Sequence, residues 1–192
     1  YTLPGIPSIY YGSEFGIEGK KERYSDDSLR PALQLADYKN AGTENPCTRL
    51  ITALGKIRQQ TKALSLGDYK ELLLTNRQYA FSRDLNGTSV VVTVNNDENP
   101  AQIHVTAGNG GAYVGALSGM NVPVEHGQIN VTLQPNSGEV WIPKENSAEE
   151  SEHISMEPVK FNAVKVEAAK VPAPEHKIEV PTNKSYDEMT IE

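Results

Sequence analysis

The feature that most constrains this chain is a series of short segments between residues 68 and 143 in which apolar and polar residues alternate. A period of two is typical of strands with one buried face, and clusters of Gly, Asn and Pro separate the segments. Asn86-Gly87 is the strongest turn, because this pair favours a two-residue hairpin. The pattern predicts an antiparallel sandwich or barrel with strands over residues 69–74, 78–83, 89–95, 101–106, 112–116, 128–133 and 138–142.

Two sets of alternating side chains in this β-domain (residues 67–143) are expected to form its core. These are Val90, Val92 and Val94 in the third predicted strand, and Ile129, Val131 and Leu133 in the sixth. Trp141 lies in the last predicted strand and is also expected in the core rather than on a binding surface.

Residues 1–66 follow a different pattern, that of a strand, a long loop and a helix. The apolar run over residues 6–11 suits a strand buried on both faces, as in a parallel sheet. The loop over residues 12–45 shows little periodicity. Asn45 can cap a helix that has Pro46 at its first position and Gly67 just past its end. Its apolar face is formed by Cys47, Leu50, Ile51, Leu54, Ile57, Thr61 and Leu64.

A single β/α unit cannot be a domain, because its strand would have bare edges and its helix an unpartnered face. We therefore expect the neighbouring elements upstream of Tyr1. At the other end, residues 144–192 hold 6 Lys against 11 Asp and Glu, four prolines and no glycine. Such a segment buries too little apolar surface to offset the entropy of ordering, and it is predicted to be a disordered acidic linker or tail.

The segment Pro-Gly-Ile-Pro-Ser-Ile-Tyr-Tyr-Gly-Ser-Glu over residues 4–14 resembles the eighth barrel strand of the α-amylase superfamily, glycoside hydrolase family 13. Members of the neopullulanase, cyclomaltodextrinase and maltogenic amylase type are the most similar. The residues that match the family pattern are Gly5, Pro7, Tyr10, Tyr11, Gly12 and Glu14. The resemblance implies the last β/α unit of a (β/α)8 TIM barrel, followed by a small antiparallel C-terminal domain.

The loop after this strand would then border the substrate groove, since barrel enzymes hold their sites at the C-terminal ends of the strands. By the resemblance, Asp26 and Arg30 are the pair that hydrogen-bonds glucose units of an α-glucan or maltooligosaccharide. The structural alternative is an ion pair between these two residues on one helical turn. Tyr11 and Glu14 are candidates for the barrel mouth. Tyr10, Tyr11 and Glu14 are expected to pack or brace that mouth rather than bind sugar.

The catalytic residues of a retaining glycosidase are absent from the sequence. The resemblance implies a nucleophilic Asp, an acid Glu and a third Asp in an Asn-His-Asp motif, all on earlier strands. Such enzymes need two carboxyl groups about 5 Å apart across the scissile bond. We therefore expect the catalytic residues upstream of Tyr1, and no hydrolase activity in this chain alone.

Composition excludes several other classes. A net charge of -7 argues against a nucleic-acid partner, and no apolar run is long enough for a membrane span. Cys47 is the single cysteine, and the four histidines fall at no metal-ligand spacing, so no metal site and no cofactor are predicted. Calcium in a longer parent protein is left open.

No signal peptide is expected in the first residues, and the compartment is left open with a slight preference for the cytoplasm.

The alternative function is a non-catalytic β-sandwich module that binds carbohydrate or a protein partner. This module would need exposed aromatic side chains, and the β-domain offers Tyr69, Tyr79, Tyr113 and Trp141. A transferase of the same family would share the upstream catalytic residues.

Overall fold

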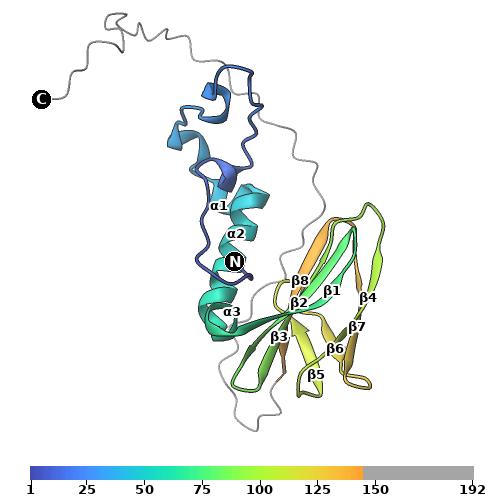
Figure 1. Ribbon diagram of the computed structural model, residues 1–192. Coiled ribbons are helices and arrows are strands. Elements are labelled where there is room, and N and C mark those ends of the chain that lie inside the picture. Colours follow the sequence, from blue (N-terminus) through green and yellow to red (C-terminus); the bar gives the residue numbers. More distant parts are fainter. Residues whose placement is uncertain (145–192) are drawn as a thin grey trace, which may run out of the picture.

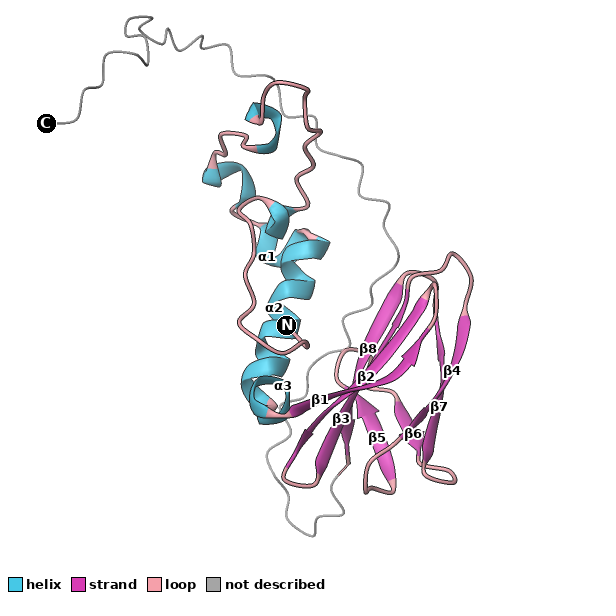
Figure 2. Cartoon of the chain, viewed as in Figure 1, coloured by secondary structure: helices cyan, strands magenta, loops and turns pink. Residues whose placement is uncertain are grey.

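The computed structural model describes residues 1–144, in which a helical part precedes a β-rich part (Figures 1 and 2). The helical part contains the 3-10 turns η1 (Ser13–Phe15), η2 (Asp27–Leu29) and η3 (Leu35–Tyr38) and the helices α1 (Ala41–Glu44), α2 (Pro46–Gln60) and α3 (Lys62–Leu66). The strands are β1 (Asp68–Leu74), β2 (Gln78–Leu85), β3 (Thr88–Asn95), β4 (Ala101–Thr106), β5 (Ala112–Gly115), β6 (Asn121–Pro123), β7 (Gln128–Leu133) and β8 (Ser137–Pro143). Apart from Lys144, the predicted acidic tail lies outside the described residues.

The strands form two antiparallel sheets, as the alternation predicts. The larger sheet has the order β1-β2-β3-β8-β5-β6, and the smaller sheet pairs β4 with β7. Asn86 and Gly87 connect β2 to β3 with φ values of 50° and 83°. Positive φ at both central residues is what a two-residue hairpin turn requires, and it confirms the predicted hairpin. The three-residue strand β6 is not among the predicted strands, because it is too short to produce a period.

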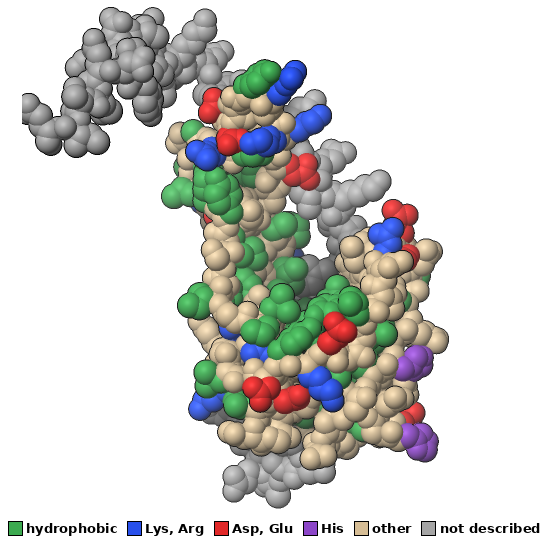
Figure 3. All heavy atoms as spheres, viewed as in Figure 1, with side chains coloured by type: hydrophobic (Ala, Val, Ile, Leu, Met, Phe, Trp, Pro, Cys, Tyr) green, Lys and Arg blue, Asp and Glu red, His purple; other side chains and the backbone are tan. Residues whose placement is uncertain are grey.

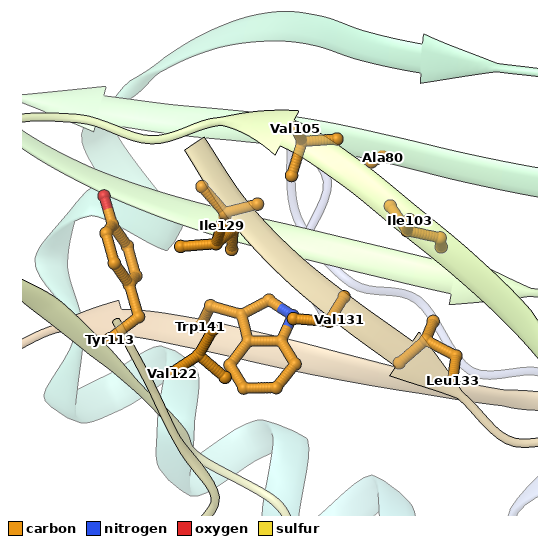
Figure 4. Close-up of a cluster of buried hydrophobic side chains, with 10 residues drawn as sticks. Ala80, Ile103, Val105, Tyr113, Val122, Ile129, Val131, Leu133 and Trp141 are labelled. Atoms are coloured by element: carbon orange, nitrogen blue, oxygen red, sulfur yellow. The ribbon is translucent and has the colours of Figure 1, made fainter. Parts of the chain in front are cut away.

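The core between the two sheets is built from alternating side chains of both (Figure 4). Trp141 is 1% exposed, and its Nε1 donates to Thr93 Oγ1 at 2.9 Å. Burial of an indole requires such a partner for its N–H group. Ile129, Val131 and Leu133 belong to this core as predicted, together with Ala80, Val91, Ile103, Val105, Tyr113 and Val122.

The other face of the larger sheet is covered by the helices, which explains the long buried runs in β2 and β3. Ile57, Ala63 and Leu64 pack there against Phe81, Val90, Val92 and Val140. Val90 and Val92 are therefore buried as predicted, but beneath the helices and not between the sheets, where Val91 lies. Val94 shares their face beyond the helices and is 36% exposed, so its assignment to the core is wrong.

The predicted long helix is divided in two at Thr61. Asn45 caps α2 as predicted, since its side chain accepts a hydrogen bond from Thr48 N. Thr61 then leaves the helical conformation, with φ -112° and ψ 91°. The chain resumes as α3, in which Ala63 and Leu64 are buried. Beyond the break, α3 packs against β2 and β3.

No strand forms over residues 6–11 within the described part of the chain. A strand needs neighbours that satisfy its backbone groups, and residues 1–144 supply none at this place. Tyr10 is 57% exposed and Ile6 is 95% exposed, so the expected packing of this run is not realised in the described residues. Whether residues 1–66 are the last unit of a barrel stays a prediction.

Two arginines join the N-terminal segment, the helices and the β-domain. Arg83 of β2 is 1% exposed and donates to the carbonyl oxygens of Thr2, Leu64 and Gly67 at 2.8–3.3 Å. Burial, together with the nearby Arg58 charge, lowers the pKa of Arg83. Its charge lies at the C-terminal end of α3, where helix carbonyls favour a cation. Arg58 donates to the carbonyl oxygens of Tyr1, Leu3, Gly5 and Leu64.

Replacing Arg83 with methionine should lower the free energy of unfolding by at least about 3 kcal/mol, since buried carbonyl groups lose their donors. Chemical denaturation monitored by circular dichroism measures this change. The control is Arg77→Met in the exposed turn before β2, which should change stability by less than about 0.5 kcal/mol. Equal effects of the two substitutions would contradict the assigned role of Arg83.

Candidate functional site

The loop over residues 12–45 is fastened to the start of α2 by side chains of that helix. Thr48 Oγ1 donates to the Glu14 carbonyl oxygen at 2.6 Å, and Asn45 Nδ2 donates to the Phe15 carbonyl oxygen at 2.8 Å. Gly12 begins the turn with a φ of 90°, a conformation that favours glycine. Asn45 therefore both caps the helix and holds the turn that begins the loop.

Asp26 and Arg30, the two predicted sugar-binding residues, flank the short turn η2. The Asp26 carboxylate pairs with Lys21, and not with Arg30 as the structural alternative required. The side chain of Asp26 is 44% exposed and that of Lys21 is 68% exposed. An ion pair this exposed contributes little to stability, so a ligand can displace it at low cost.

Tyr11 lies beside the far end of this turn. Its hydroxyl donates to the Pro31 carbonyl oxygen at 3.4 Å. Partial burial and the neighbouring Tyr10 hydroxyl raise the pKa of Tyr11, and the Arg30 charge opposes that rise. The structure thus brings Tyr11 close to Arg30, although the two are far apart in sequence.

Glu14 carries a buried carboxylate oxygen, Oε2, that has no hydrogen-bond partner among residues 1–144. Its backbone carbonyl is the group that Thr48 holds. A buried carboxylate oxygen ordinarily has a donor. The bracing role expected of Glu14 at a barrel mouth stays a prediction.

Two aromatic residues of the rival binding-module hypothesis are buried. Tyr113 donates to the Ser89 carbonyl oxygen at 2.9 Å, and Trp141 fills the core. The hydroxyl groups of Tyr69 and Tyr79 form a hydrogen bond with each other. This bond is the main cause that raises the pKa of Tyr79 to about 12. Tyr113 and Trp141 are therefore not available as an aromatic platform, whereas Tyr69 is 40% exposed.

Sequence reasoning missed several polar residues that organise the structure. Glu139 is buried, and its carboxylate accepts hydrogen bonds from the backbone N–H groups of Leu117, Ser118 and Val140. Its position between apolar residues of a predicted strand was the available signal. Within residues 1–144, no three His, Cys, Asp or Glu side chains come together to hold a metal ion, and no helix is long and apolar enough to cross a membrane.

Comparison with known proteins agrees with the antiparallel fold of the β-domain. Residues 69–138 match the family model of the maltogenic amylase C-terminal domain. The cyclomaltodextrinase of Thermoanaerobacter pseudethanolicus is 33% identical over 96 residues, which cover 50% of this chain and 16% of that enzyme. The neopullulanase 2 of Thermoactinomyces vulgaris is 28% identical over 71% of this chain and 23% of its own length.

This chain resembles the C-terminal part of α-amylase superfamily enzymes. The predicted resemblance and the predicted antiparallel β-domain are thereby confirmed. The cyclomaltodextrin glucanotransferase CldA shares the fold with a TM-score of 0.60 and 26% identity, over 73% of this chain and 29% of that chain. This chain thus spans less than a third of the length of each of these relatives.

The fastening of the loop to α2 predicts the effect of Asn45→Ala. The substitution removes both the cap and the bond to Phe15, and it should lower the free energy of unfolding by about 1–2 kcal/mol. Thermal unfolding measures the loss. Asn76→Ala in the exposed β1–β2 turn is the matched control, and a loss as large there would contradict the role of Asn45.

Proposed function

We propose that this chain is the C-terminal portion of a retaining glycoside hydrolase acting on α-glucans. Residues 1–66 would close its (β/α)8 barrel, and the β-domain would cover the helices of that barrel. The observation that carries the proposal is the extent of the sequence match. The neopullulanase 2 alignment covers 141 residues, and it therefore extends well beyond the β-domain match over 69–138.

Exposed apolar side chains support a missing barrel. Leu3, Ile6, Ile9, Tyr10 and Tyr11 are all exposed along the N-terminal segment. Figure 3 shows further hydrophobic side chains gathered between the helical part and the β-domain. A contiguous apolar surface of this kind marks an interface. Neighbouring barrel strands would pair with the first segment and bury it.

Asp26 and Arg30 are the residues that we assign to substrate binding. An ionised carboxylate accepts hydrogen bonds from adjacent sugar hydroxyls, and a guanidinium group donates to others. Asp26 and Arg30 flank the turn η2, and the weak Lys21 pair leaves Asp26 accessible. Tyr11 and Glu14 would support the groove from the end of the preceding strand.

Kinetics of the longer protein that contains this chain test the assignment. Asp26→Ala or Arg30→Ala should lower kcat/KM on maltooligosaccharides by about tenfold or more, because each removes a charged hydrogen bond to substrate. The melting temperature should stay within about 2 °C of the parent value, since both side chains are at least partly exposed.

The neighbouring carboxylate Asp27 provides the control for this experiment. Asp27→Ala removes an equal charge from the same turn, and it should leave kcat/KM within about twofold of the parent value. Unchanged kinetics of both Asp26→Ala and Arg30→Ala on short and long substrates would contradict the proposed binding role.

The chain by itself should release no reducing sugar from starch, pullulan or cyclodextrins. The family's nucleophile, acid and Asn-His-Asp residues are not in its sequence, and chemistry at a glycosidic bond needs a pair of carboxyl groups across that bond. A reducing-sugar assay with the purified 192-residue chain measures this. Sustained release of reducing sugar by the purified chain, lost in its Asp26→Ala variant, would contradict the proposal.

A further inference from the structure

A cavity of about 320 Å³ lies where η3 leads through α1 into α2. Its walls come from residues 37–41 and 44–46, so the Asp26–Arg30 pair does not contribute to it. This volume is at the lower end of the range for small-molecule sites, about 300–1,000 Å³. The cavity therefore has room for one small ligand.

Tyr38 is one of the residues that line the cavity, and its aromatic ring is held by a stacking partner. The ring stacks on Phe15 with a centroid separation of 4.1 Å and an interplanar angle of 13°. The Phe15 backbone is itself fixed by Asn45 of the helix cap. An immobilised aromatic ring loses little conformational entropy when a ligand binds. Tyr38 is half-buried and lines the cavity, so part of its side chain stays accessible from there.

The rest of the wall is polar and rich in hydrogen-bond acceptors. Asp37, Asn40 and Glu44 are exposed, and Asn40 Nδ2 donates to Glu44 Oε1 at 3.1 Å, which orients both side chains. Carboxylates accept hydrogen bonds from hydroxyl groups, and the amide both donates and accepts. Lys39 offsets one of the two negative charges. A fixed ring beside several hydroxyl acceptors suits a neutral, polyhydroxylated ring.

We propose that this cavity binds one glucose ring of an α-glucan, with Tyr38 as the stacking platform and Asp37, Asn40 and Glu44 as the hydrogen-bonding groups. The choice of an α-glucan rests on the proposed function. The pocket itself rests on the geometry of residues 37–46 and goes beyond the Asp26–Arg30 assignment.

Titration of the 192-residue chain with maltotriose, followed by amide NMR shifts, tests the pocket. The unmodified chain should show saturable shifts in residues 37–46. Asn40→Ala and Glu44→Gln change exposed side chains, and each should weaken binding by about fivefold or more. Tyr38→Ala should abolish the shifts. The two exposed substitutions keep the test decisive if loss of the ring unfolds the loop.

Asp27→Ala is the matched control, because it removes an exposed loop carboxylate that lies outside the pocket and is not assigned to sugar binding, and it should leave the shifts of residues 37–46 unchanged. If maltotriose produces no saturable shifts there, or if Asn40→Ala and Glu44→Gln bind like the parent, the pocket assignment is overturned. Shifts produced by Ca²⁺ alone and not by maltotriose would also overturn it. Unchanged kinetics of the Asp26 and Arg30 variants would refute the binding role of that pair and leave the pocket result standing.

Discussion

The buried guanidinium group of Arg83 is the interaction on which the arrangement of this chain depends. It reaches carbonyl groups in the N-terminal segment and at the end of α3, two regions far from β2 in sequence. Carbonyl dipoles at a helix end, rather than a carboxylate, balance its charge. Together with Arg58, it fixes where the helices lie on the sheet and where residues 1–5 run across them. The loop that carries the proposed sugar-binding residues is hydrogen-bonded to the start of α2, one of these helices.

Coverage by the helices buries both faces of the larger sheet along the middle of β2 and β3. Its core toward the smaller sheet contains Trp141, and its core toward the helices contains Phe81 and Leu64. Burial on both faces accounts for the continuous apolar character of β3. Apolar side chains outside the area that the helices cover stay exposed. The proposed barrel would cover them. The stability of the β-domain and the position of the loop are therefore coupled through α2 and α3.

Features with a local cause could be predicted from the sequence. The alternation gave the longer strands, Asn86-Gly87 the hairpin, and Asn45-Pro46 the start of α2. Features that depend on contacts distant in sequence could not. Val90 and Val91 look alike in the pattern, and only the position of the helices decides which face each one meets. Arg83 is buried because carbonyl groups from other segments surround it, and Lys21 rather than Arg30 pairs with Asp26. The pocket beside Tyr38 likewise arises from a stack on Phe15 that no sequence spacing indicates.

The central claim is that residues 1–66 complete a sugar-binding groove whose catalytic carboxylates belong to earlier barrel strands. Active sites of barrel enzymes are assembled from loops after several strands, so one unit can bind substrate without performing the chemistry. The most direct test is the sequence of the coding DNA upstream of Tyr1. The account predicts an open frame with an Asn-His-Asp motif within about one β/α unit, and an Asp and a Glu on strands further upstream. An upstream frame without these carboxylates would contradict it.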